Sequence, residues 1–196
     1  MVNLPEGKMK SREGKVVDAD NLMDLLYDMA KEAVDEKNGN LSDSDKKYIA
    51  EKISLSALKY YLLNFSTIKD ITFSPEKSIS FDGNTGPYLQ YATARINSLL
   101  KKADFKKDDI NNFDFQKYSF NADEWNIVSF LLEFEENVIK SADNYSPIEI
   151  CNYLYELSRL YNKFYHDNPI LNEEKDKQIL RSALSFAVLT VVKNGL

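Results

Sequence analysis

PIEICNYLYELSRLYNKFYH, residues 147–166, carries the pattern that decides the fold class. Its apolar side chains recur at alternating steps of four and three residues, at Ile150, Leu154, Leu157, Tyr161 and Phe164. A helix with about 3.6 residues per turn gathers such positions on one face. The spacing therefore predicts an amphipathic helix over 147–166 with a buried stripe.

The same periodicity recurs along most of the chain. It predicts helices from Asp20 to the stop at 37–40, from Ser42 or Ser44 to about Leu62, from the NTGP sequence at 84–87 to about Lys102, over 122–140, and over 173–193. Residues 70–83 are predicted to be extended or looped, and residues 15–17 to form a short strand. Short connections make neighbouring helices antiparallel, so the C-terminal helices are expected to form a bundle.

Composition agrees with an all-α protein. The chain has 196 residues, of which 43% are hydrophobic, enough to build a sizeable core. It has only 6 glycines and 5 prolines, too few for the many turns of a β-sandwich. The predicted fold class is therefore all-α, a helical bundle preceded by a loop and a further helical segment.

Cysteine and histidine usage excludes several classes of site. The single cysteine, Cys151, and the single histidine, His166, exclude an internal disulfide and a multi-cysteine zinc site, so no metal is predicted. With no secretory signal, a reducing cytoplasm is the expected compartment. The longest apolar runs, such as 186–192, are too short to span a bilayer, so no membrane role is expected.

Charge is distributed unevenly along the chain. The net charge is −6, but residues 59–107 carry +4 whereas residues 108–196 carry −7. A negative total argues against indiscriminate binding of nucleic acid, and the basic stretch leaves room for a local site. The polar, asparagine-rich residues 103–115 separate the two parts, and we predict a hinge there.

No catalytic group can be assembled from these residues. Cys151 and His166 lie about four turns apart on one predicted helix, so they cannot meet as a nucleophile and its base. Cys151 is best interpreted as a buried core residue, and His166 as a helix-end residue near the negative end of the dipole. Glu135 and Glu136 are adjacent, hence on different helix faces, and are interpreted as solvated surface.

The stretch PYLQYATAR, residues 87–95, contains a candidate binding strip. Helical spacing places Tyr88 and Tyr91 on one face and Arg95 one turn further along. Tyrosine rings can stack on unpaired bases and an arginine can bind the adjoining phosphate, which suits a single-stranded RNA loop. The alternative is a pair of core tyrosines with their hydroxyls at the rim.

The loop GKMKSREG, residues 7–14, is a second candidate. Glycines at both ends free the backbone, and three cations with a serine hydroxyl could surround phosphate oxygens. Taken alone, the loop can equally be a flexible surface segment with solvated charges.

Four stretches together resemble the C-terminal portion of the arginyl-tRNA synthetases, a class I synthetase family. They are LPEGKMKSREGKVVDADNL (4–22), FDGNTGPYLQYATARI (81–96), SPIEICNYLYELSRLYNKFYHDNPIL (146–171) and LRSALSFAVLTVVKNGL (180–196). They occur in the family's order and span nearly the whole chain. The resemblance implies a helical anticodon-binding domain at 81–196, a helical segment contacting the tRNA stem at 21–80, and a remnant of the catalytic domain at 1–20.

The resemblance also implies roles for individual residues. The loop Lys8, Met9, Lys10, Ser11 and Arg12 is similar to the family's KMSKS loop, which stabilises the phosphates of ATP. Ser11 stands where the consensus has its second lysine, so either Lys10 or Arg12 is left to replace it. The implied tRNA-binding residues are Tyr88, Gln90, Tyr91, Arg95 and Tyr165. Thr93 stands where the family commonly has histidine, so that histidine's role is not carried over.

The family's full-length reaction uses ATP with magnesium to attach arginine to tRNA(Arg). The HIGH-type signature and the nucleotide-binding domain are absent here, so we expect a fragment of a longer chain that is inactive alone and binds no cofactor. The chain also stops at KNGL, where the family continues with a short extension. A cytoplasmic monomer is expected. The alternative function is a helical protein–protein interaction module with tyrosine anchors, which added salt should barely weaken.

Overall fold

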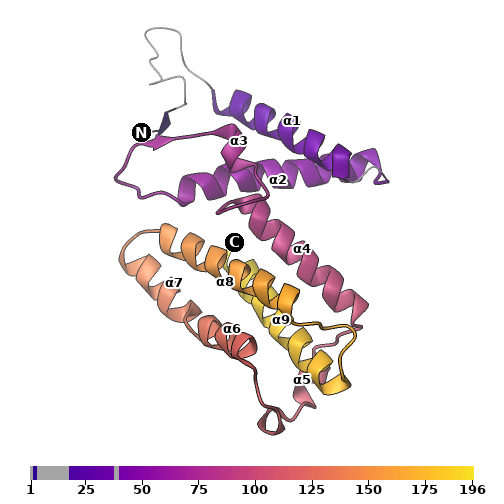
Figure 1. Ribbon diagram of the computed structural model, residues 1–196. Helices are drawn as coiled ribbons and strands as arrows, with labels where there is room; N and C mark the ends of the chain where they lie inside the picture. Colours follow the sequence, from indigo (N-terminus) through magenta and orange to yellow (C-terminus); the bar gives the residue numbers. More distant parts are fainter. Residues whose placement is uncertain (1, 4–17, 38–39) are drawn as a thin grey trace. The chain divides into compact units, whose positions relative to one another are not determined.

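The computed structural model describes residues 2–3, 18–37 and 40–196 and is mostly helical there, with strands of only two residues, which confirms the all-α prediction (Figure 1). The KMSKS-like loop at 8–12 and the strand predicted at 15–17 lie outside the described residues. The elements in order are β1 (Val2–Asn3), α1 (Ala19–Lys37), α2 (Asp43–Leu63), β2 (Ile71–Thr72), α3 (Pro75–Ser78), α4 (Gly86–Lys102), α5 (Asp108–Asn111), the 3₁₀ helix η2 (Phe115–Lys117), α6 (Ala122–Leu132), α7 (Phe134–Asp143), α8 (Ile148–Asp167) and α9 (Lys175–Gly195).

The chain forms two compact units, Met1–Gln90 and Tyr91–Leu196, which divide inside α4. The resemblance implied domains at 21–80 and 81–196, and the compact units described here divide ten residues later along the chain. The first turn of α4 instead belongs to unit 1. A Cβ on Gly86 would lie 2.6 Å from the Ser56 carbonyl oxygen, and the Gln90 amide donates to the Lys52 carbonyl at 3.2 Å.

The predicted hinge at 103–115 lies wholly within unit 2. It contains the short helices α5 and the start of η2 rather than only loop. The Phe105 ring lies 5.9 Å from that of Phe186 in α9, so this segment packs on the bundle. Aromatic side chains at otherwise polar positions therefore fold the segment back onto unit 2.

Unit 1 is built on the pairing of α1 with α2, which run side by side (Figure 1). Ala30, Val34, Ala50 and Ile53 form its buried cluster, and the alanines allow the two backbones to approach closely. Ser42 caps α2, because its Oγ accepts the Asp45 N–H at 3.2 Å, which settles the choice between the two candidate serines. The two-residue strands β1 and β2 pair in parallel beside this helix pair.

Unit 2 is organised around α8 and α9, and Figure 1 shows these two helices between α4 and the α6–α7 pair. The predicted stripe of α8 is confirmed at Leu154, Leu157, Tyr161 and Phe164, which are all buried, whereas Ile150 is half-buried. The facing stripe of α9 consists of Leu180, Leu184, Val188 and Val192. Burial of each such side chain contributes roughly 1.5–3 kcal/mol, so these two helices supply much of the hydrophobic stabilisation.

The helix predicted over 122–140 is two helices, because the chain breaks at Glu133. The Glu133 N–H bonds to the Phe130 carbonyl at 3.2 Å, three residues back, which tightens the turn as in a 3₁₀ helix. A capping box between Asn121 and Glu124 starts α6. No glycine or proline marks this break, so apolar periodicity alone predicts one continuous helix.

A buried ion pair joins α6 to α9. Arg181 Nε donates to Glu124 Oε1 at 2.8 Å, and Arg181 Nη1 donates to the Pro169 carbonyl at 2.6 Å. The second Glu124 oxygen accepts the Asn121 N–H at 2.9 Å. Both charged groups are buried and fully engaged, as a charge removed from water requires.

Candidate functional site

Helix α4 presents Tyr91 and Arg95 on one face of unit 2. The two residues are four apart, one helical turn, so their side chains meet. Arg95 Nη2 donates to the Tyr91 hydroxyl at 2.9 Å, and the guanidinium carbon lies 4.8 Å from the centre of the Tyr91 ring. Tyr91 as a whole stays 48% exposed, so part of the residue remains open to a ligand.

Helix α8 supplies the other side of the site. Arg95 Nη1 donates to Asn162 Oδ1 at 3.0 Å, and the guanidinium carbon lies 5.5 Å from the centre of the Tyr165 ring. Tyr165 in turn lies 6.2 Å from the buried Tyr161 ring, which braces it against the core. We refer to Tyr91, Arg95, Asn162 and Tyr165 as the arginine–tyrosine cluster.

The charge of Arg95 is not neutralised within the described part of unit 2. Its hydrogen-bonding partners are a phenol and an amide, and its other contacts are the two rings. No carboxylate of the described residues lies within ion-pair distance of it. A guanidinium carries five N–H donors, and two of them are used here, which leaves three for an anionic ligand.

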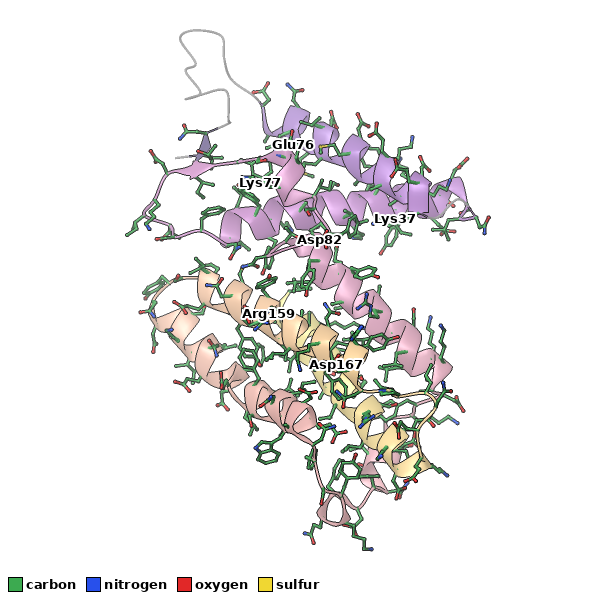
Figure 2. All side chains as sticks on the ribbon, in the orientation of Figure 1. Lys37, Glu76, Lys77, Asp82, Arg159 and Asp167 are labelled. Atoms are coloured by element: carbon green, nitrogen blue, oxygen red, sulfur yellow. The ribbon has the colours of Figure 1, made fainter. Side chains whose placement is uncertain are left out.

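The lysine and arginine side chains of α8 are paired with carboxylates, unlike Arg95 of α4. Figure 2 labels Arg159 and Asp167 on this helix: Arg159 Nε bonds to Glu156 at 2.8 Å, and Lys163 Nζ lies 3.4 Å from Asp167. Lys163 also bonds to Asp123 at 3.0 Å, and that hydrogen bond lowers the pKa of the Asp123 carboxyl. Each of these cations is compensated by a neighbouring carboxylate, so it attracts an external anion less than Arg95 does.

The structure divides the predicted strip between the two units. Tyr88 and Gln90 belong to unit 1, where Tyr88 is half-buried and its N–H donates to Thr85 Oγ1 at 3.2 Å. Tyr91 and Arg95 belong to unit 2 and meet Tyr165 there. Unit 2 therefore unites three of the five predicted tRNA-binding residues, while Lys8, Met9, Lys10, Ser11 and Arg12 lie outside the described residues.

Asn162 is the member of the cluster that the sequence did not single out. It lies three residues before Tyr165, so helical spacing places both on one face of α8. That spacing was the only available signal. Its bond to Arg95 spans 67 positions in sequence, which no local pattern reports.

The residues weighed for catalysis occupy structural positions. Cys151 is buried, and burial raises the pKa of its thiol to about 11, so it is protonated at neutral pH and a poor nucleophile. His166 is exposed in the last turn of α8, and its Nδ1 lies 2.8 Å from Asp167. Among the described residues, no three histidine, cysteine or acidic side chains gather into a group able to hold a metal.

No helix within the described ranges is long and apolar enough to cross a membrane.

Comparison with known proteins adds a family. The model of the DALR anticodon binding domain matches residues 89–196. Arginine–tRNA ligase of Borrelia hermsii is 45% identical over 198 residues, which cover 99% of this chain and 33% of that protein. The arginine–tRNA ligase of Treponema denticola is 44% identical over 200 residues, covering all of this chain and 34% of that protein.

A solved structure is similar over the whole chain as well. Arginyl-tRNA synthetase of Thermus thermophilus superposes with a TM-score of 0.87 at 28% identity, covering 100% of this chain and 32% of that structure. The chain therefore spans about a third of the length of the relatives that it matches.

Proposed function

We propose, from the premise that the chain belongs to the DALR anticodon-binding domain family, that unit 2 binds the anticodon loop of tRNA(Arg) through the arginine–tyrosine cluster. The observation that carries the proposal is the guanidinium of Arg95, which lies between two tyrosine rings with no carboxylate among its described partners. Such a cation attracts an anion from outside the unit. A phosphate of RNA supplies one, and the adjoining bases supply partners for the rings.

Each residue of the cluster has its own part in this binding. The exposed Tyr91 ring offers a flat surface on which one unpaired base of the loop stacks, an interaction that contributes about 1–3 kcal/mol. Arg95 directs its remaining N–H groups at a phosphate oxygen next to that base. Asn162 and Tyr165 are positioning residues, because they fix the guanidinium by a hydrogen bond and by a ring contact.

The wider function follows from the relatives. We propose that the whole protein is an arginine–tRNA ligase that acts in the cytoplasm as a monomer, and that residues 8–12 bind the phosphates of ATP with its magnesium ion. Tyr88 and Gln90 are proposed to contact the same tRNA from unit 1. The support for these proposals is the identity of 43–45% to arginine–tRNA ligases over nearly the whole chain.

Substitution of Tyr91 tests the proposed surface directly. We expect Tyr91→Ala to weaken binding of a tRNA(Arg) anticodon stem-loop about 5- to 150-fold, the range that corresponds to the loss of one stacked base. Fluorescence anisotropy with a labelled stem-loop measures the dissociation constant. Tyr145→Ala is the matched control, since Tyr145 is 88% exposed in the same unit and outside the cluster. Equal affinities of the two variants, with helix content intact, would contradict the proposal.

The salt dependence distinguishes RNA from the alternative of a protein partner anchored by the tyrosines. Each phosphate contact to a single strand lowers the logarithm of the binding constant by about 0.7 per tenfold increase in salt. Replacing Arg95 by alanine should therefore reduce that slope by about 0.7. If the tyrosines instead bound a protein partner through aromatic burial, the binding constant of the unsubstituted chain would hardly change with salt.

A further inference from the structure

The outer side of α6 and α7 carries apolar side chains exposed to solvent. Trp125, Leu132 and Ile139 are 56%, 78% and 54% exposed, although soluble proteins bury most such residues. Trp125 and Leu132, seven residues apart on α6, fall on the same side of that helix with a drift of about 20°, and Ile139 lies on α7 beyond the break at Glu133. We call these three residues the α6–α7 stripe. Figure 1 shows α6 and α7 following one another along the edge of unit 2 opposite α4.

Acidic side chains border the stripe. Residues 122–143 carry a net charge of −5, and Glu133, Glu135, Glu136 and Asp143 are all exposed. Within the described ranges none of these four carboxylates lies within ion-pair distance of a cation, and Lys140 is engaged by Glu149 at 3.0 Å. The stripe thus combines large apolar anchors with a rim of uncompensated negative charge.

We propose that the α6–α7 stripe is a docking surface for a basic amphipathic helix of a partner protein. Trp125 and Leu132 give one side of α6 two exposed apolar anchors, against which the apolar side of another helix can pack. Lysine or arginine flanking the partner's own apolar seam would pair with the four free carboxylates. This surface is separate from the arginine–tyrosine cluster, so the proposal does not depend on RNA binding.

Charge selects this occupant over two others. An RNA backbone would bring phosphates toward at least four carboxylates, which repel it. A second copy of the same stripe would place acidic rims against each other, and like charges in contact repel. A positively charged partner satisfies both the anchors and the rim.

The position of Trp125 gives the experiment its probe. It is the only tryptophan of the chain and a member of the stripe, so its fluorescence reports occupancy of this surface directly. The ligand is a synthetic three-heptad helical peptide with leucine at the first and fourth positions and lysine at the flanking positions. We expect a saturable shift of the emission to shorter wavelength, with an affinity that falls as salt is added.

Three comparisons decide the outcome. Leu132→Gln should weaken binding at least about tenfold, because one buried anchor carries a large share of such an interface. The matched control Leu171→Gln removes an exposed leucine of the same unit outside the stripe and should leave the affinity unchanged. A peptide with glutamate in place of each lysine should not bind.

The results that overturn the proposal are equally specific. They are the absence of an emission shift, equal binding of the lysine and glutamate peptides, or equal effects of the two leucine substitutions. Leu132 is 78% exposed, so its replacement should leave the fold intact, which far-UV circular dichroism verifies. Leu132→Gln should also keep the parent affinity for the anticodon stem-loop, which separates this surface from the proposed RNA site.

Discussion

Two arginines in unit 2 have opposite environments. Arg181 is buried, and Glu124 and Glu173 face its guanidinium at 2.8 and 3.6 Å. Arg95 is half-buried, and its described partners are an amide, a phenol and two rings. Carboxylates thus neutralise the arginine in the core, whereas the charge of Arg95 has no such counter-charge among its described partners. The difference indicates that Arg181 holds the bundle together, whereas Arg95 is available to an anion from outside.

The largest expected effect comes from removing Glu124, the carboxylate that neutralises Arg181 in the core. Glu124→Ala leaves a buried guanidinium without its partner, which should lower the free energy of unfolding of unit 2 by about 3–5 kcal/mol. Urea denaturation followed by the fluorescence of the sole tryptophan, which lies in unit 2, measures this change. The stem-loop affinity of the folded fraction should stay at the parent value.

Glu135→Ala is the control for that substitution. Glu135 is exposed on α7, and no described cation pairs with it, so its removal should change stability by no more than about 0.5 kcal/mol. If Glu124→Ala were as mild as Glu135→Ala, the pair with Arg181 would not organise the core, and the contrast between the two arginines would disappear.

The buried side of α8 also predicts a sensitivity to alkaline pH. Burial raises the pKa of the Cys151 thiol from 9.0 to about 11, so the unfolded chain releases this proton at a lower pH than the folded chain does. The stability from the neutral thiol is complete below pH 9 and is lost as the pH rises from 9 toward 11. The loss amounts to roughly 2–3 kcal/mol over that interval. Burial raises the pKa of Tyr153 and of Tyr161 as well, which extends the loss above pH 10.

Cys151→Ala tests this dependence. The variant should start from a lower stability at pH 7, because it leaves a small cavity, yet it should lose less stability than the parent between pH 8 and 10. Denaturation midpoints at several pH values measure both quantities. Parallel pH profiles for parent and variant would show that the thiol does not titrate differently in the two states.

The spacing of residues within single helices predicted part of the structure of unit 2. The steps of four and three residues in 147–166 identified the buried stripe of α8, since every member of that stripe belongs to one helix. The one-turn spacing of Tyr91 and Arg95 likewise predicted a contact that the structure contains. Periodicity within a helix is a local property, so the sequence displays it directly.

Contacts between distant segments could not be read in this way. Arg181 meets Glu124 across 57 positions and Arg95 meets Asn162 across 67, and nothing near either arginine indicates which of them finds a carboxylate. The helix break at Glu133 and the division inside α4 also depend on tertiary packing. The sequence therefore predicted the helices and three members of the cluster, Tyr91, Arg95 and Tyr165. It did not predict which of the two arginines has a carboxylate partner.

The last test gives Arg95 a carboxylate partner of the kind that Arg181 has. Asn162→Asp places a carboxylate where the amide oxygen lies, 3.0 Å from Arg95 Nη1, and so gives Arg95 the internal counter-charge that Arg181 already has. A neutralised guanidinium no longer needs a phosphate, and the new charge repels one. We expect stem-loop affinity to fall about tenfold and the salt slope to decrease by about 0.7, with stability unchanged or raised by up to about 1 kcal/mol.

Asn126→Asp is the control, because it makes the same change of net charge at an exposed position on α6. Neither Tyr91 nor Asn162, the hydrogen-bonding partners of Arg95, belongs to that helix. It separates the local effect from the general one, because a uniform increase in negative charge would weaken RNA binding equally in both variants. A loss confined to Asn162→Asp would show that the uncompensated state of Arg95 drives binding. Equal losses would mean that the environment of this arginine is incidental, and that the exposed ring of Tyr91 alone recognises the loop.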